Sequence, residues 1–108
     1  MILMPIVYVT DMDASLAFYE SLGFEITSRS EMWSQLRAGD GAVLALHGAA
    51  PEQAAHVDLA LVAEEPLERV AERVPPRRGI ADEAFGRSLV VEDPDGMRIQ
   101  VNEHDHTL

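Results

Sequence analysis

A seven-residue pattern occurs twice in the chain. Residues 40–46 read Asp-Gly-Ala-Val-Leu-Ala-Leu, and residues 95–101 read Asp-Gly-Met-Arg-Ile-Gln-Val. Each copy is an Asp-Gly turn that leads into a strand, because the turn dipeptide is followed by apolar and β-branched residues. One copy lies in each half of the chain, which indicates an internal repeat.

Around the two turns, the same order of elements recurs in both halves. The first half predicts strands at 2–10, 24–28, 33–37 and 42–47 and a helix at 14–22; the second predicts strands at 57–62, within 77–86, at 88–92 and at 97–102 and a helix at 66–74. We therefore predict an α+β fold of tandem βαβββ modules, about 1–48 and 56–103, within a single domain of residues 1–108. They should form a curved mixed sheet with helices on its outer face and an open trough on the other.

Two apolar patterns predict which helix faces are buried. Phe18 and Leu22 lie one turn apart on one face of the first helix. In the second helix, Leu67, Val70, Ala71 and Val74 follow the i, i+3, i+4, i+7 spacing of a buried stripe.

Composition excludes several classes of function. The 108 residues contain no cysteine, so a disulfide framework and a thiolate zinc site are excluded. Nineteen acidic residues against eight basic ones give a net charge of −11. This charge argues against nucleic acid and anionic membranes as partners and favours a cationic ligand. No apolar stretch is long enough for a membrane span and no secretory signal is evident, so we expect a cytoplasmic protein.

Short motifs in this order resemble the vicinal oxygen chelate superfamily, which includes glyoxalase I, extradiol dioxygenases and bleomycin resistance proteins. They are Val9-Thr10-Asp11 before the first helix, Phe18-Tyr19 and Leu22-Gly23-Phe24 at its end, and Asp93-Pro94-Asp95-Gly96 before the last strand. The resemblance implies the tandem βαβββ fold, with a binding site in the trough.

The same resemblance implies where a divalent metal would be held in enzymes of this superfamily. The four ligand positions correspond here to Met4, Ala45, Val57 and Gln100, with His56 as an alternative to Val57 at the third position. Alanine and valine carry no donor atom, and a thioether is a soft ligand. We therefore expect no metal site and no cofactor, and we expect the chain not to be an enzyme.

Within the superfamily, the chain most resembles the metal-free bleomycin-resistance type. Shared features are Pro5 ahead of Asp11 and the Phe85-Gly86-Arg87 segment before the last turn. The resemblance implies a homodimer that binds a small cationic or aromatic compound, such as an antibiotic, without changing it. This chain is shorter than that type, which leaves the identity of the compound open.

The expected ligand site combines an apolar floor, an aromatic wall and hydrogen-bonding groups. Its ligand-binding residues are Met4, Ile6, Tyr8, Trp33, Gln35, Ala45, His47, Phe85, Gln100 and Asn102. For Trp33 a place in the core beneath a helix is an equal alternative, and for Tyr8 a dimer contact is another. Phe85 closes the trough as a flap or anchors its own loop, and Arg87 binds a carboxylate or caps the Asp93 turn.

Two rival functions remain. One is a metal-dependent lyase, isomerase or dioxygenase with displaced ligands, for which His47, His56 and Glu103 or His104 are the candidates; the simpler interpretation places His104–His106 in a chain end. The other is an interaction module with no small ligand, which a trough filled by side chains would favour.

Overall fold

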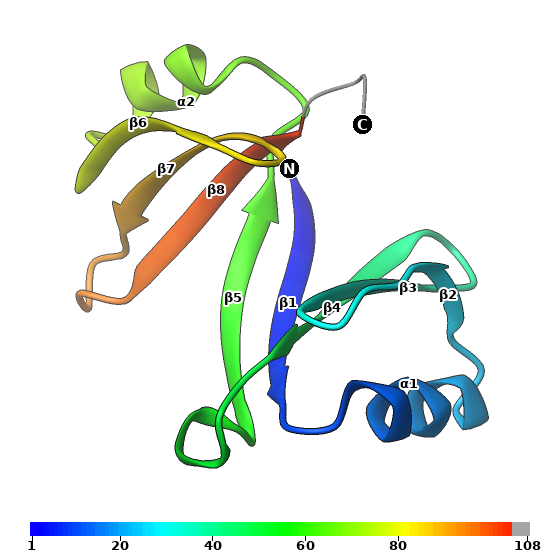
Figure 1. Ribbon diagram of the computed structural model, residues 1–108. Coiled ribbons are helices and arrows are strands. Elements are labelled where there is room, and N and C mark those ends of the chain that lie inside the picture. The colour runs from blue at the N-terminus through cyan, green and yellow to red at the C-terminus, as the bar shows by residue number, and fades with distance from the viewer. Residues whose placement is uncertain (105–108) are drawn as a thin grey trace. The chain divides into compact units, whose positions relative to one another are not determined.

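The computed structural model describes residues 1–104, and these form two compact units. The first module comprises residues 4–58, and the second comprises residues 59–104 together with residues 1–3. Figure 1 shows their elements in order. These are β1 (Ile2–Val9), α1 (Met12–Ser21), β2 (Glu25–Ser28), β3 (Trp33–Ala38), β4 (Ala42–Gly48), a 3-10 turn (Pro51–Gln53), β5 (His56–Val62), α2 (Leu67–Arg73), β6 (Arg78–Glu83), β7 (Gly86–Glu92) and β8 (Arg98–His104).

Both modules have the same strand connections, which confirms the predicted α+β fold of two βαβββ modules. In the first module the order is β2-β3-β4-β1, with β1 parallel to β4 and the other pairs antiparallel. In the second module it is β5-β8-β7-β6, with β5 parallel to β8. Each sheet is therefore mixed, because the helix after its first strand makes a parallel crossover possible.

The two Asp-Gly turns adopt matching conformations. Gly41 has φ +100° and Gly96 has φ +88°, values that a side chain would strain. The second turn is also held by Asp93, whose carboxylate accepts hydrogen bonds from the backbone N–H groups of Asp95 and Met97 at 2.9 and 2.8 Å. The repeat seen in sequence is thus a repeat of backbone geometry.

In the first module, α1 covers one face of the sheet. The helix begins after Asp11, whose carboxylate accepts a hydrogen bond from the N–H of Ala14 at 3.0 Å. Met12 and Leu16 of the helix are buried against Leu36, Leu44 and Leu46 of the sheet. The expected buried pair was wrong: Phe18 is 57% and Leu22 62% exposed. The helix turns its Met12–Leu16 side inward instead, and Tyr19 follows on that side.

In the second module, α2 packs on its own sheet through most of the predicted stripe. Leu67 and Val70 are buried with Leu89 and Val101, and Ala71 packs against this cluster. The last member was wrong, because Val74 lies beyond the end of the helix and is 40% exposed. Among the described residues, neither helix is long and apolar enough to cross a membrane.

We expect Leu16→Ala to lower the free energy of unfolding by about 2–5 kcal/mol, because it opens a cavity in a fully buried site. Phe18→Ala should change it by no more than about 0.5 kcal/mol, because that ring is largely exposed. Urea unfolding of both variants measures this contrast. Equal losses would show that Phe18 belongs to the core after all.

Candidate functional site

The face of the first module that α1 leaves uncovered carries the candidate ligand residues. Side chains alternate along a strand, so Val7 and Val9 of β1 pack on the helix side while Met4, Ile6 and Tyr8 point the other way. Strand register extends this helix-free face, because Tyr8 pairs with His47 in β4 and His47 pairs with Trp33 in β3. Trp33 is therefore on the helix-free face and not in the core beneath α1.

Four rings gather at one end of this face. Tyr8 and His47 are stacked with ring centroids 5.1 Å apart, and His56 lies on Tyr8 at 5.5 Å. Trp33 meets His47 edge-on at 6.1 Å. We name Tyr8, Trp33, His47 and His56 the aromatic cluster. Tyr8, Trp33 and His47 are half-buried and His56 is exposed, so the cluster retains surface that a flat molecule can contact.

A carboxylate joins two members of the aromatic cluster. The Tyr8 hydroxyl donates a hydrogen bond to Oδ2 of Asp58 at 2.8 Å, and Nε2 of His56 lies 2.7 Å from Oδ1 of the same residue. Burial of the phenol, its hydrogen bond to Asp58 and the Asp58 charge together raise the pKa of Tyr8 to about 12. Tyr8 therefore stays protonated at neutral pH and acts as a donor.

The expected apolar floor lies on the same face but is closed to solvent. Met4 and Ala45 have no exposed surface and Ile6 is 8% exposed. Gln35 is half-buried, and its amide donates to the Met4 sulfur at 3.5 Å. Tyr8, Trp33, Gln35 and His47 therefore keep accessible surface on this face, whereas Met4 and Ala45 have none.

The helix-free face of the second module carries the polar candidates. Gln100 donates a hydrogen bond to Oδ1 of the buried Asn102 at 2.7 Å. Asn102 pairs across the strands with Ser88, whose buried hydroxyl accepts from Nη2 of Arg78 at 2.7 Å and donates to Glu83 at 2.8 Å. Asn102 and Ser88 are thus held by neighbouring side chains.

Phe85 lies in the turn between β6 and β7. Its ring meets that of His104 at 5.3 Å, and the residue is half-buried. Burial lowers the pKa of His104, so this imidazole favours the neutral form. The contact ties the turn to the end of β8 and fits the predicted anchoring role of Phe85.

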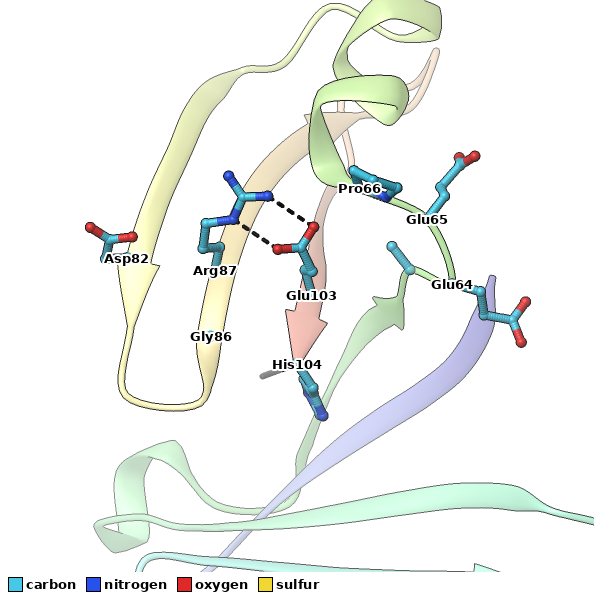
Figure 2. A pocket seen from close by; sticks show the side chains of 9 residues that line it. Glu64, Glu65, Pro66, Asp82, Gly86, Arg87, Glu103 and His104 are labelled. Carbon is cyan, nitrogen blue, oxygen red and sulfur yellow. Dashed lines mark hydrogen bonds and ion pairs between the residues drawn. The ribbon is translucent and has the colours of Figure 1, made fainter. Parts of the chain in front are cut away.

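A pocket of about 570 Å³ opens beside this turn in the second module. Figure 2 shows it between the start of α2 and the strands β6, β7 and β8. Its lining residues are Ala63, Glu64, Glu65, Pro66, Asp82, Gly86, Arg87, Glu103 and His104. The sequence did not predict this pocket, because its acids are dispersed between residues 64 and 103.

Arg87 crosses this pocket as a structural clamp. Its Nε and Nη2 donate to both oxygens of Glu103 at 2.8 and 2.9 Å (Figure 2). Its Nη1 and Nη2 donate to both oxygens of Glu68 on α2 at 2.6 and 2.9 Å. Glu103 also accepts the backbone N–H of Leu67, the first residue of α2, at 3.0 Å. The guanidinium lowers the pKa of Glu103 and brings that of Glu68 to about 2. Of the two roles predicted for Arg87, the cap on the Asp93 turn was wrong, because the Asp93 carboxylate itself caps that turn.

The comparisons with known proteins agree with this architecture. The family model of the Glyoxalase/Bleomycin resistance protein/Dioxygenase superfamily matches residues 2–101. The chain belongs to this superfamily. A search of curated protein sequences gave no match.

Solved structures similar to this superfamily member share its fold at low sequence identity. An NAD-dependent benzaldehyde dehydrogenase from Legionella pneumophila is 18% identical with a TM-score of 0.69, covering 95% of this chain and 99% of that one. A superfamily member from Vibrio splendidus 12B01 is 20% identical with a TM-score of 0.67, covering 94% and 97%. A bleomycin-binding protein from Streptomyces verticillus complexed with copper(II)-bleomycin is 20% identical with a lower TM-score of 0.46, covering 94% of each chain.

The side chains at the four positions that the sequence analysis matched to metal ligands are poor ligands. Met4 and Ala45 are buried, Val57 is exposed, and Gln100 is bound to Asn102. Within residues 1–104, no group of three or more His, Asp or Glu side chains is arranged to hold a metal ion. Of the displaced candidates, Glu103 is engaged by Arg87. The simpler interpretation was wrong for His104, which is the last residue of β8 and not part of a loose chain end. Asp105 and His106 lie outside the described residues.

Sequence reasoning missed Asp58 and the partners of Arg87. The predicted strand 57–62 began one residue too late to show the signal: in β5, His56 and Asp58 stand two apart and so share a face. No such signal marks Glu68, Arg87 and Glu103, which come together only when α2 folds onto the sheet.

We expect stability to fall at alkaline pH because the pKa of Tyr8 is higher in the folded chain than its ordinary value of 10.0. Below pH 10 the Tyr8 phenol is protonated in both the folded and the unfolded chain, so its contribution to the free energy of unfolding is complete. Between pH 10 and about 12 the unfolded chain loses this proton first, and the free energy of unfolding decreases. Denaturant titrations across this range measure the effect. Tyr8→Phe should remove this decrease in the free energy of unfolding, whereas Tyr19→Phe should leave it in place.

We expect Arg87→Gln to lower the melting temperature at neutral pH by several degrees, because Glu68 and Glu103 lose their shared partner. The pKa of each carboxyl is lowered, so the clamp is complete above pH 4.5 and lost as the pH falls toward about 2. The difference from wild type should shrink over that range. Arg98→Gln is the matched control, since Arg98 has no ion pair within residues 1–104. A constant difference at every pH would contradict the clamp.

Proposed function

We propose that this superfamily member is a metal-free binding protein for a small aromatic or cationic compound, of the antibiotic-sequestering kind, acting in the cytoplasm. The observation that carries the proposal is the aromatic cluster on the helix-free face of the first module. Stacked and edge-on rings with accessible surface suit a flat ligand, and a carboxylate beside them suits a positive charge.

The side chains at the positions matched to metal ligands support a function in binding without metal chemistry. Three of the four positions at which superfamily enzymes hold their ion are Met4, Ala45 and Val57, which offer no hard ligand atom. Gln35 and Gln100 are half-buried and present amide groups, which orient a ligand through hydrogen bonds. The net charge of −11 adds long-range attraction for a cation.

A homodimer belongs to the same proposal. β2 and β6 lie at the ends of their modules' strand orders, and both are short and largely exposed. Leu22, just after the end of α1, adds exposed apolar surface. A second copy of the chain would cover such edges and surface.

We expect a bleomycin-type drug to change the emission of Trp33, which is the only tryptophan in the chain. His47→Ala should weaken binding about two- to tenfold, because it removes the ring between Tyr8 and Trp33. Phe18→Ala, which removes an exposed ring on the helix side of the same module, should bind like wild type. Absence of any response at high micromolar drug, by emission and by calorimetry, would refute this ligand.

Native mass spectrometry after addition of nickel, zinc, manganese or iron distinguishes the metal-free binding protein from the rival function, a metal-dependent enzyme with displaced ligands. We expect no stoichiometric metal on the intact chain. A single bound ion that disappears in His47→Ala would overturn the metal-free proposal and favour the enzyme.

A further inference from the structure

Asp58 is a carboxylate held in place by the aromatic cluster. Tyr8 at the end of β1 binds one of its oxygens and His56 at the start of β5 approaches the other, at 2.8 and 2.7 Å. Its side chain is nevertheless 50% exposed. Two contacts therefore fix the orientation of the carboxylate while leaving lone pairs toward solvent.

No arginine neutralises this carboxylate in the part of the chain that the structure describes. Its ion-pair partner there is His56, which carries charge only when protonated, whereas Asp13, Glu65, Glu68, Glu92 and Glu103 are each paired with an arginine. Asp58 thus keeps its negative charge available beside the rings of Tyr8 and His56.

The surroundings of Asp58 combine two attractions for the same kind of group. A cation near an aromatic face is attracted by the ring, and a planar cation with two N–H donors also matches the two oxygens of a carboxylate. Tyr8, stacked on His47, supplies the ring surface next to the carboxylate. A neutral aromatic compound gains the stacking alone.

We propose that Asp58 is the anionic anchor of the ligand site and selects planar cations, of the amidinium or guanidinium class, over neutral aromatic compounds of the same shape. This inference rests on the proposed function and specifies its ligand class. Asp58 contacts the ligand's charged group, the rings of the aromatic cluster contact its flat part, and the Tyr8 hydroxyl orients Asp58.

Calorimetric titration with benzamidinium and with benzamide tests the anchor, since these probes share a shape and differ in charge. Wild type should bind benzamidinium at least about fivefold more tightly. Asp58→Asn should reduce this ratio to near one while leaving benzamide affinity unchanged. Glu20→Gln on α1 makes the same change in net charge away from the site, so its ratio should match wild type.

Tyr8→Phe provides a second variant in case Asp58→Asn fails to fold. It keeps the ring and removes the hydroxyl that orients Asp58, so the ratio should fall partway. A Tyr8→Phe ratio equal to that of wild type would contradict the orienting role.

The outcomes separate the anchor from the proposed function. Equal affinity of wild type for the two probes, or an unchanged ratio in Asp58→Asn, overturns the anchor while aromatic binding stands. Failure of both probes to bind, while a bleomycin-type drug still changes Trp33 emission, likewise overturns the anchor alone. Failure of the probes and the drug together overturns both proposals.

Discussion

The parallel pairing of β1 with β4 is the constraint on which the first module depends. It sets Tyr8 opposite His47 and Ile6 opposite Ala45, and with β3 alongside it sets His47 opposite Trp33. A slip of one residue would send these side chains to the helix side and bring Val7 and Leu46 out. Burial of leucines under α1 therefore fixes the position of the rings on the opposite face.

The second module has the same strand order as the first but carries different side chains on its two faces. Its helix-side face carries the Arg87 clamp, and its helix-free face carries polar side chains bound to one another. Salt-bridged side chains at its pocket stabilise the position of α2, whose seven residues are too few to form a stable helix alone. The repeat thus preserves backbone geometry while the two modules carry different chemistry.

The sequence predicted the fold well because turns and alternation are local signals. The Asp-Gly turns and the strand alternation located nearly every element. They left the face of Trp33 open, and only its pairing with His47 across β3 and β4 places it on the helix-free face. Helix rotation was harder: Phe18 and Leu22 satisfy the periodicity as well as Met12 and Leu16 do, and only packing on the sheet distinguishes them. The clamp of Arg87 with Glu68 and Glu103 could not be predicted, because it joins side chains from three elements.

The connection from β4 to β5 is anchored to β1 at both of its ends. The N–H of Ala49 donates to the carbonyl of Val9 at 2.9 Å, and the N–H of Ala55 donates to that of Tyr8 at 3.1 Å. Ala55 has a φ of 55°, a conformation that a non-glycine residue seldom adopts. Residues 50–54, between these two anchors, are therefore the segment that can be shortened or lengthened. Inserting residues beside Ala55 would instead displace His56 from Tyr8.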